Sequence, residues 1–206
     1  MILSKVAASA LLMTAADYSM FHLSPTEDPY AFSALAVSFC VGLISVLKGV
    51  YDDDETSQAQ DNDYNTEDFW RFAVNVLEMA QLPLINVHMY LQSQRCHSLA
   101  RTHGIFIIPL SIEVLLRYFS DLKYDVSFKN LTILGNVFSL LFLAINENNK
   151  ICFVLASVSS FTYVIASFMG EHFRNSRDIV KLIGHSAFVL TIAFTVKDAA
   201  IAFKKA

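Results

Sequence analysis

The amino-acid sequence predicts an all-α, polytopic membrane protein, with a single domain over residues 1–206 and seven transmembrane helices. Two observations carry this prediction. The chain is 54% apolar and only 17% charged, whereas soluble domains average about 45–50% apolar and about 25% charged residues. Its charged residues also gather between long apolar runs, so they cannot coat the outside of a soluble fold. A surface that faces lipid explains both.

Seven apolar runs follow one another along the chain, each near the roughly 20 residues that a helix needs to cross a bilayer. They cover residues 2–23, 30–51, 69–91, 105–120, 126–145, 151–170 and 179–203. In the first run Lys5 precedes a stretch of small residues, which is also typical of a signal peptide, but we expect this run to be retained as a span.

Polar breaks separate the runs and explain where each helix should end. Residues 24–29 contain two prolines, and residues 51–68 hold eight acidic residues and no basic one. We expect this acidic stretch to be a solvated loop, because its likeness to an EF-hand ends at Thr66, where glycine is required. Polar residues at 146–150 and 171–178 precede the last two runs. The short breaks make consecutive helices antiparallel neighbours.

The distribution of Lys and Arg predicts the orientation in the membrane. With a lumenal amino terminus, the cytosolic segments hold Arg95, Arg101, Lys150, Lys204 and Lys205, against three basic residues in lumenal loops. We therefore expect a cytosolic carboxyl terminus. Lys204 and Lys205 also resemble a dilysine signal for retrieval to the endoplasmic reticulum, and an interfacial basic end explains them equally well.

Several function classes lack support in the sequence. The balance of 15 basic and 19 acidic residues gives no basic excess for binding nucleic acid. Cys40, Cys96 and Cys152 are odd in number, and no cysteine or histidine spacing is typical of zinc. His97 and His103 are expected in a loop, away from the other histidines. We predict no metal, no cofactor and no enzyme, since no catalytic motif is present.

Polar residues inside the third run are the first candidates for a functional site, because polar groups are costly in a bilayer. The run holds Asn75, Glu78, Gln81, Asn86 and His88. The first four fall within one helical stripe, so their amide and carboxyl groups are expected to bond across helices in a dry interior. Proton transfer between an acid and a histidine is the alternative interpretation.

Other runs carry further candidates. Glu113 and Arg117 are four residues apart, so they share one helical face and can form an ion pair, with a relay or binding site as the alternative. Asn136 is an amide in the fifth run. His185 follows Gly184, which permits close approach of a neighbouring helix, and we expect His185 to serve packing.

The stretch that enters the fifth run resembles a motif of the transmembrane protein 147 family. It reads Tyr124-Asp125-Val126-Ser127-Phe128-Lys129-Asn130-Leu131-Thr132-Ile133-Leu134-Gly135-Asn136-Val137. The family pattern is aromatic, Asp, two variable residues, aromatic, one variable residue, amide, Leu or Met, Ser or Thr, Ile, two variable residues, Asn and a β-branched residue. The sequence follows it without a gap, and the residues that match are Tyr124, Asp125, Phe128, Asn130, Thr132 and Asn136.

This resemblance implies a function through partners. It implies a seven-span, Aph-1-like bundle in the endoplasmic reticulum that acts as a non-enzymatic scaffold for nicalin-like and NOMO-like proteins. The complex would work beside the Sec translocon and ribosome during insertion of multi-span membrane proteins. Arg95 and Arg101 would then be a candidate loop for ribosomal phosphates, with ordinary positive-inside charge as the alternative. A transporter or channel that uses the intramembrane charges is the alternative function.

Overall fold

The computed structural model describes the chain over residues 2–54, 63–120, 126–165 and 177–205, and for some of these only the backbone. Over these ranges the chain is helical and has no β-strand, which confirms the predicted all-α class. The helices are α1 (Ile2–His22), α2 (Pro29–Asp54), α3 (Asp63–Gln92), α4 (Leu99–Ser120), α5 (Val126–Asn146), α6 (Lys150–Ser160) with its π-helical continuation η1 (Phe161–Ile165), and α8 (Arg177–Lys205).

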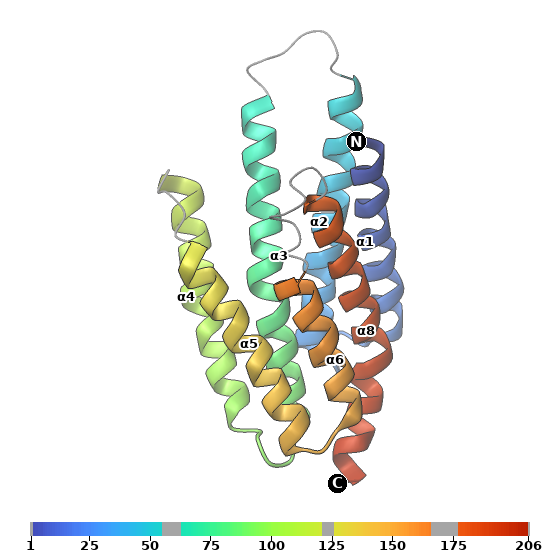
Figure 1. The fold of residues 1–206 in the computed structure, drawn as a ribbon, viewed down its shortest axis with the longest axis vertical. Coiled ribbons are helices and arrows are strands. Elements are labelled where there is room, and N and C mark those ends of the chain that lie inside the picture. The colour runs from blue at the N-terminus through green and yellow to red at the C-terminus, as the bar shows by residue number, and fades with distance from the viewer. Residues whose placement is uncertain (1, 55–62, 121–125, 166–176, 206) are drawn as a thin grey trace.

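The helices form one elongated bundle in which successive helices run in opposite directions (Figure 1). The amino terminus lies near one end of the bundle and the carboxyl terminus lies at the other, and we call these the amino end and the carboxyl end. The α3 helix packs against α2, α4, α5 and α8, and α8 also packs against α1, α6 and η1. These two helices therefore hold the interior together.

The helix boundaries differ from the predicted runs mainly at two helix starts. The α3 helix begins at Asp63, whereas the apolar run begins at Phe69, and α4 begins at Leu99 in place of Ile105. Hydropathy marks only the apolar part of a helix, and these two helices extend beyond it into polar sequence. His103 is consequently in a helix, so its expected place in a loop is wrong.

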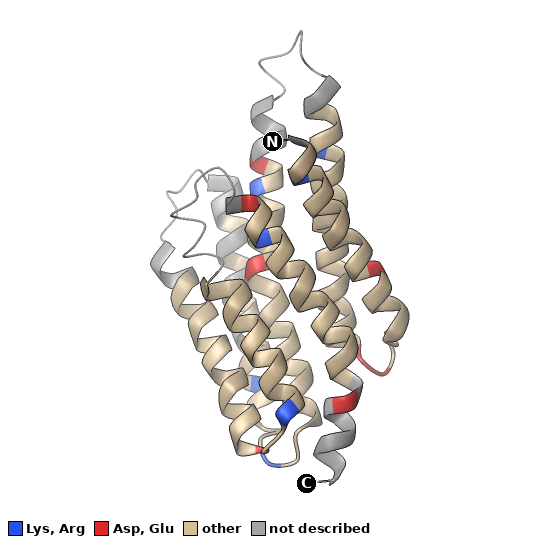
Figure 2. Ribbon diagram, turned by 45° about the vertical axis from the view of Figure 1, so that its right-hand side comes forward, with Lys and Arg blue, Asp and Glu red and all other residues tan. Residues whose placement is uncertain are grey.

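Two segments of the described chain are long and apolar enough to cross a membrane, judged by length and composition. They are Pro29–Tyr51 in α2 and Asp178–Val196 in α8. Asn130–Asn146 and Lys150–Ile165 are apolar but shorter. These segments favour association with a membrane. Figure 2 shows the charged residues gathered mainly towards the two ends of the bundle.

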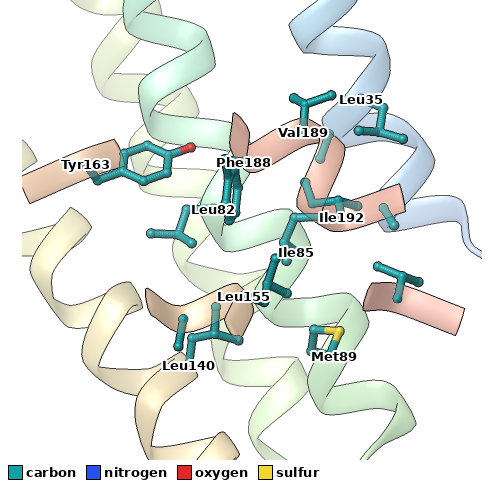
Figure 3. Close-up of a cluster of buried hydrophobic side chains, with 14 of the residues drawn as sticks. Leu35, Leu82, Ile85, Met89, Leu140, Leu155, Tyr163, Phe188, Val189 and Ile192 are labelled. Atoms are coloured by element: carbon teal, nitrogen blue, oxygen red, sulfur yellow. The ribbon is translucent and has the colours of Figure 1, made fainter. Parts of the chain in front are cut away.

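The core of the bundle is built from aliphatic layers and a few aromatic rings (Figure 3). Leu82 and Ile85 of α3 meet Leu155 of α6 and Phe188 of α8, and all four side chains are fully buried. Close packing of α1 on α2 depends on glycine, since a Cβ at Gly42 would lie 2.8 Å from the backbone nitrogen of Met13. Small residues let helix backbones approach in this way.

Two asparagines have structural roles in the connection between α5 and α6. Asn148 adopts a positive φ of 49°, which ends α5 with a left-handed residue, a conformation that asparagine tolerates. Asn149 then caps α6, because its side-chain oxygen accepts from the backbone N–H groups of Ile151 at 3.0 Å and Cys152 at 3.3 Å. The local sequence therefore encodes the tight reversal.

Candidate functional site

A fully buried glutamine on α3 joins four helical segments. The Nε2 atom of Gln81 donates to the hydroxyl of Ser38 on α2 at 2.7 Å. Its Oε1 atom accepts from the hydroxyl of Tyr163 on η1 at 2.6 Å and from Nδ1 of His185 on α8 at 2.9 Å. We call these four residues the glutamine cluster. Since an amide oxygen only accepts, Nδ1 of His185 carries a proton here.

The π-helical turn η1 positions Tyr163 for this bond. Tyr163 is buried, and its ring stands edge-on to His185, with 5.1 Å between the ring centroids. Next to it, the hydroxyl of Thr162 donates to the carbonyl of Gly184 at 2.9 Å, and a Cβ on Gly184 would lie 3.3 Å from Thr162. Single π-helical turns often occur where a side chain must be redirected at a functional site. Gly184 thus lets α8 approach η1 closely.

An ion pair lies one helical turn from the glutamine cluster. The Nζ atom of Lys181 donates to Oε1 of Glu78 at 2.6 Å. The Glu78 side chain is only 6% exposed, and that of Lys181 only 16% exposed. The pair joins α3 to α8, because Glu78 precedes Gln81 by one turn and Lys181 precedes His185 by one turn. The cation neutralises a carboxylate that burial would otherwise disfavour.

A second polar cluster joins α3, α4 and α5. Asn86 donates through Nδ2 to the carbonyl oxygen of Asn136 at 3.0 Å and to its Oδ1 at 2.9 Å. The hydroxyl of Tyr90 donates to the carbonyl of Ser139 at 2.8 Å. His103 lies 3.2 Å from Asn136 Oδ1 through Nδ1 and 2.8 Å from the Ser139 hydroxyl through Nε2. We call these five residues the asparagine cluster.

The direction of hydrogen bonding in the asparagine cluster follows from its acceptors. Because Oδ1 of Asn136 can only accept, Nδ1 of His103 donates to it, and Nε2 of a neutral ring then accepts from Ser139. The rings of His103 and Tyr90 stack, with centroids 4.9 Å apart. The Oδ1 atom of Asn86 is buried and has no hydrogen-bond partner among the residues that the structure describes. The asparagine cluster therefore differs from the glutamine cluster, in which the side-chain oxygen of Gln81 accepts two hydrogen bonds.

Two further contacts fix the carboxyl end of α3. His88 Nε2 lies 3.5 Å from Oδ1 of Asp28, the residue before α2, and 2.9 Å from Nε2 of Gln92. Both His88 and Asp28 are buried. The Asp28 carboxylate and the His88 ring therefore join the start of α2 to the last turns of α3.

The loop after α3 is held by a buried carboxylate. Glu147 accepts from the hydroxyl of Ser93 and from the backbone N–H of Arg95, the latter at 3.1 Å. The guanidinium of Arg95 donates to the carbonyl of Asn146 at 3.0 Å, near the end of α5, where a cation is favourable. Arg95 and Arg101 are both exposed at the carboxyl end. Arg95 thus has a structural contact, whereas Arg101 presents its side chain outwards.

The structure divides the predicted polar stripe of α3 between different neighbours. Glu78 and Gln81 face α2 and α8, whereas Asn86 faces α5. Five residues at about 100° each separate Gln81 from Asn86, which turns the latter well away from the former. Asn75 is half-buried one turn before Glu78. Asn86 therefore does not share the face of Gln81, although both bond across helices as expected.

The remaining predicted site residues include those of the 124–137 motif. Asn130 is exposed, and the carbonyl of Thr132 accepts from Nδ2 of Asn136 at 2.9 Å. Asn136 is therefore a residue of the 124–137 motif that belongs to the asparagine cluster. Some predicted site residues lie outside the part of the chain whose side chains the structure describes: Glu113, Arg117, Tyr124, Asp125, Phe128, Lys204 and Lys205.

Sequence reasoning missed several members of these clusters. Ser38 and Ser139 are ordinary in apolar helices, where a serine usually bonds its own backbone. Tyr163 and Lys181 become site residues only through a neighbouring helix. His103 was missed because hydropathy does not mark the start of α4 at Leu99, one turn before it.

The outer surface of the bundle has the opposite character from its interior. Large apolar side chains are exposed on every described helix. Phe21 of α1, Ile108 of α4 and Ile145 of α5 are 89%, 60% and 72% exposed, respectively. The Glu78 carboxylate and the amides of Gln81, Asn86 and Asn136 are instead buried. Buried polar groups and large exposed apolar side chains are the reverse of the usual arrangement in a water-soluble domain.

These features define the class as an all-helical bundle with a polar interior, an apolar outer surface and two helices of membrane-spanning length and composition. A family model described as a domain of unknown function (DUF4791) matches residues 25–196, which is more than half of the chain. The protein therefore belongs to the DUF4791 family. No curated protein and no solved structure matches the chain.

Proposed function

We propose that this protein is a seven-span membrane protein and that all seven helices cross the bilayer. The single observation that carries this proposal is the apolar outer surface around a hydrogen-bonded interior. In water, an apolar surface on every helix would favour aggregation, whereas in a bilayer it faces hydrocarbon. The charged residues near the two ends of the bundle then lie close to the headgroups (Figure 2).

Within that membrane placement, the protein acts as a non-enzymatic scaffold subunit of an endoplasmic reticulum complex. Nicalin-like and NOMO-like proteins are its partners, and the complex works beside the Sec translocon and ribosome as multi-span proteins insert and fold. The resemblance of residues 124–137 to the transmembrane protein 147 family supports this role. The hydrogen bonds of Gln81 and Asn136 also support it, because they tie helices to one another as a rigid support requires.

Purification of the tagged full-length chain in mild detergent tests the scaffold role. We expect a membrane protein with a large lumenal domain to co-purify, together with translocon subunits. The matched control is Asp17→Asn, which changes an exposed charge outside the candidate sites without removing any bond described above. A monomer without partners under these conditions would contradict the scaffold role.

Site-specific labelling tests the topology separately. Single cysteines placed at Ser98 and at Ser4 in a chain without its native cysteines would report opposite sides of the membrane in sealed microsomes. We expect the reagent to reach position 98 from the cytosolic side and position 4 only after permeabilisation. Labelling of both from the cytosolic side would contradict an odd number of spans between positions 4 and 98.

A transporter or channel is the second candidate function. The buried Glu78–Lys181 pair and His185 favour it, because charged groups in a membrane interior often mark a pathway for ions or protons. Flux measurements in proteoliposomes distinguish the two functions. Transport that Glu78→Gln abolishes, with the bundle still folded, would replace the scaffold proposal.

A further inference from the structure

A groove of about 210 Å³ lies between α3 and α4. Phe72, Val76 and Met79 of α3 form one wall, and Ile107 and Leu115 of α4 form the other. The polar side chain in this lining is that of Ser111, whose hydroxyl donates to the carbonyl of Ile107 at 2.9 Å. The groove therefore offers hydrocarbon contacts and suits an apolar occupant.

The α3 wall of this groove stands apart from the main core. Met79 packs with Phe72 and Val76 in a small apolar cluster, whereas Leu82 and Ile85 belong to the large cluster shared with α8 and α6. An unfilled apolar groove loses dispersion contacts on its open side. A flexible hydrocarbon occupant would restore them.

The size and surroundings of the groove select among apolar occupants. One turn of an α-helix with side chains, about 10–12 Å wide and 5.4 Å long, occupies roughly 400–600 Å³, which is at least about twice the volume of this groove. An apolar cavity of about 150 Å³, in contrast, already holds a benzene ring. Beside the groove, α4 exposes Ile108, Ile112 and Leu116. In the proposed membrane placement these side chains face lipid, so acyl chains are already present beside the groove.

We propose that this α3–α4 groove binds one acyl chain of a bilayer phospholipid. The inference rests on the membrane placement proposed above and deepens it, because it assigns a lipid-binding site to one face of the bundle. The bound chain would pack on Met79 and Leu115 and so hold α4 against α3. Other lipids would contact the outer surface only transiently.

Photolabelling tests this site in the intact protein. The full-length chain would be reconstituted in phosphatidylcholine vesicles that contain a phosphatidylcholine with a diazirine on one acyl chain, and adducts would be mapped by mass spectrometry. We expect more adducts on Met79 and Leu115 than on exposed Phe138 and Ile145 of α5. Ser111→Leu should fill the groove and remove most of this excess labelling.

The matched control is Ile112→Leu, which changes an exposed α4 side chain beside the groove and should leave the labelling pattern unchanged. Ala80→Leu fills the groove from the α3 wall and provides a second test if Ser111→Leu does not fold, with folding checked by gel filtration and thermal unfolding. Equal labelling of the groove and α5 in the wild-type chain would overturn the lipid site alone. An excess in the groove that survives in a folded filling variant would do the same.

Two other outcomes have distinct meanings. Absence of adducts on Phe138 and Ile145 as well would overturn the membrane placement itself. Adducts on Phe138 and Ile145 without any on Met79 and Leu115 would overturn the acyl-chain site and keep the membrane placement.

Discussion

The glutamine and asparagine clusters are both built around amides on α3, but their hydrogen bonding differs. In the glutamine cluster, Oε1 of Gln81 accepts twice and Nε2 donates once, so both ends of the amide are used. In the asparagine cluster, both bonds of Asn86 come from Nδ2, and its buried Oδ1 has no partner in the described part of the chain. A buried acceptor without a bond carries a desolvation cost. The comparison indicates that Gln81 stabilises the bundle more than Asn86 does.

The largest effect is expected beside the glutamine cluster, in the ion pair. Lys181→Met should destabilise the bundle by about 3 kcal/mol, because it removes the ammonium group that lies 2.6 Å from the buried Glu78 carboxylate. Unfolding by SDS in mixed micelles would measure this loss. The double variant Glu78→Gln with Lys181→Met should recover much of it, and an unchanged loss in the double variant would show that the charge pair is not the cause.

Replacing Gln81 should have the next largest effect. Gln81→Met keeps the side-chain length but removes three bonds to neighbouring helices, and we expect a loss of about 2 kcal/mol. The same SDS titration measures it. The control Gln94→Met changes an exposed glutamine and should leave the midpoint within error. A Gln81 effect no greater than that of Gln94 would remove the structural basis of the comparison.

Replacing Asn86 should cost less. Asn86→Leu removes two hydrogen bonds but also removes the buried acceptor that lacks one, so we expect a loss of about 1 kcal/mol or less. Asn130→Leu, on the exposed surface of α5, is the control. A loss larger than that of Gln81→Met would reverse the proposed ranking and indicate that Asn86 Oδ1 binds an ordered water.

The smallest effect is expected outside both clusters, in the loop after α3. Arg95→Gln should lower stability by about 0.5 kcal/mol, because an exposed side chain loses its bond to the carbonyl of Asn146. Arg101→Gln should have no measurable effect on unfolding. If the two variants behave alike, the Arg95 contact adds nothing to the stability of the loop.

The sequence predicts the helices well because membrane-like helices are marked by apolar length. The α1, α2 and α5 boundaries lie close to the apolar runs, since polar breaks coincide with helix ends there. The start of α3 could not be placed in this way, because residues 63–68 are polar and still helical. Hydropathy identifies the apolar part of a helix, and it does not show where a helix continues into polar sequence.

The candidate site is harder to predict from sequence, since its partners come from different helices. The polarity of Gln81 and His185 is visible in the sequence, but their meeting depends on the rotation of α3 against α8. Tyr163 could not be assigned at all, because its partner Gln81 is 82 residues away in the sequence and lies on another helix. Pairings of this kind depend on tertiary geometry, whereas the capping role of Asn149 is local and follows from sequence.

The π-helical turn at Phe161–Ile165 has a consequence for how the length of this protein can vary in evolution. A π-helical turn contains one more residue than an α-helical turn. In an α-helix, each successive side chain is rotated by about 100° from the one before it. A one-residue deletion just before Tyr163 would therefore turn its hydroxyl away from Gln81. We expect DUF4791 relatives that lack this extra residue also to carry an apolar side chain where this chain has Gln81. A change in chain length on one helix would then be inherited together with a change in polarity on another.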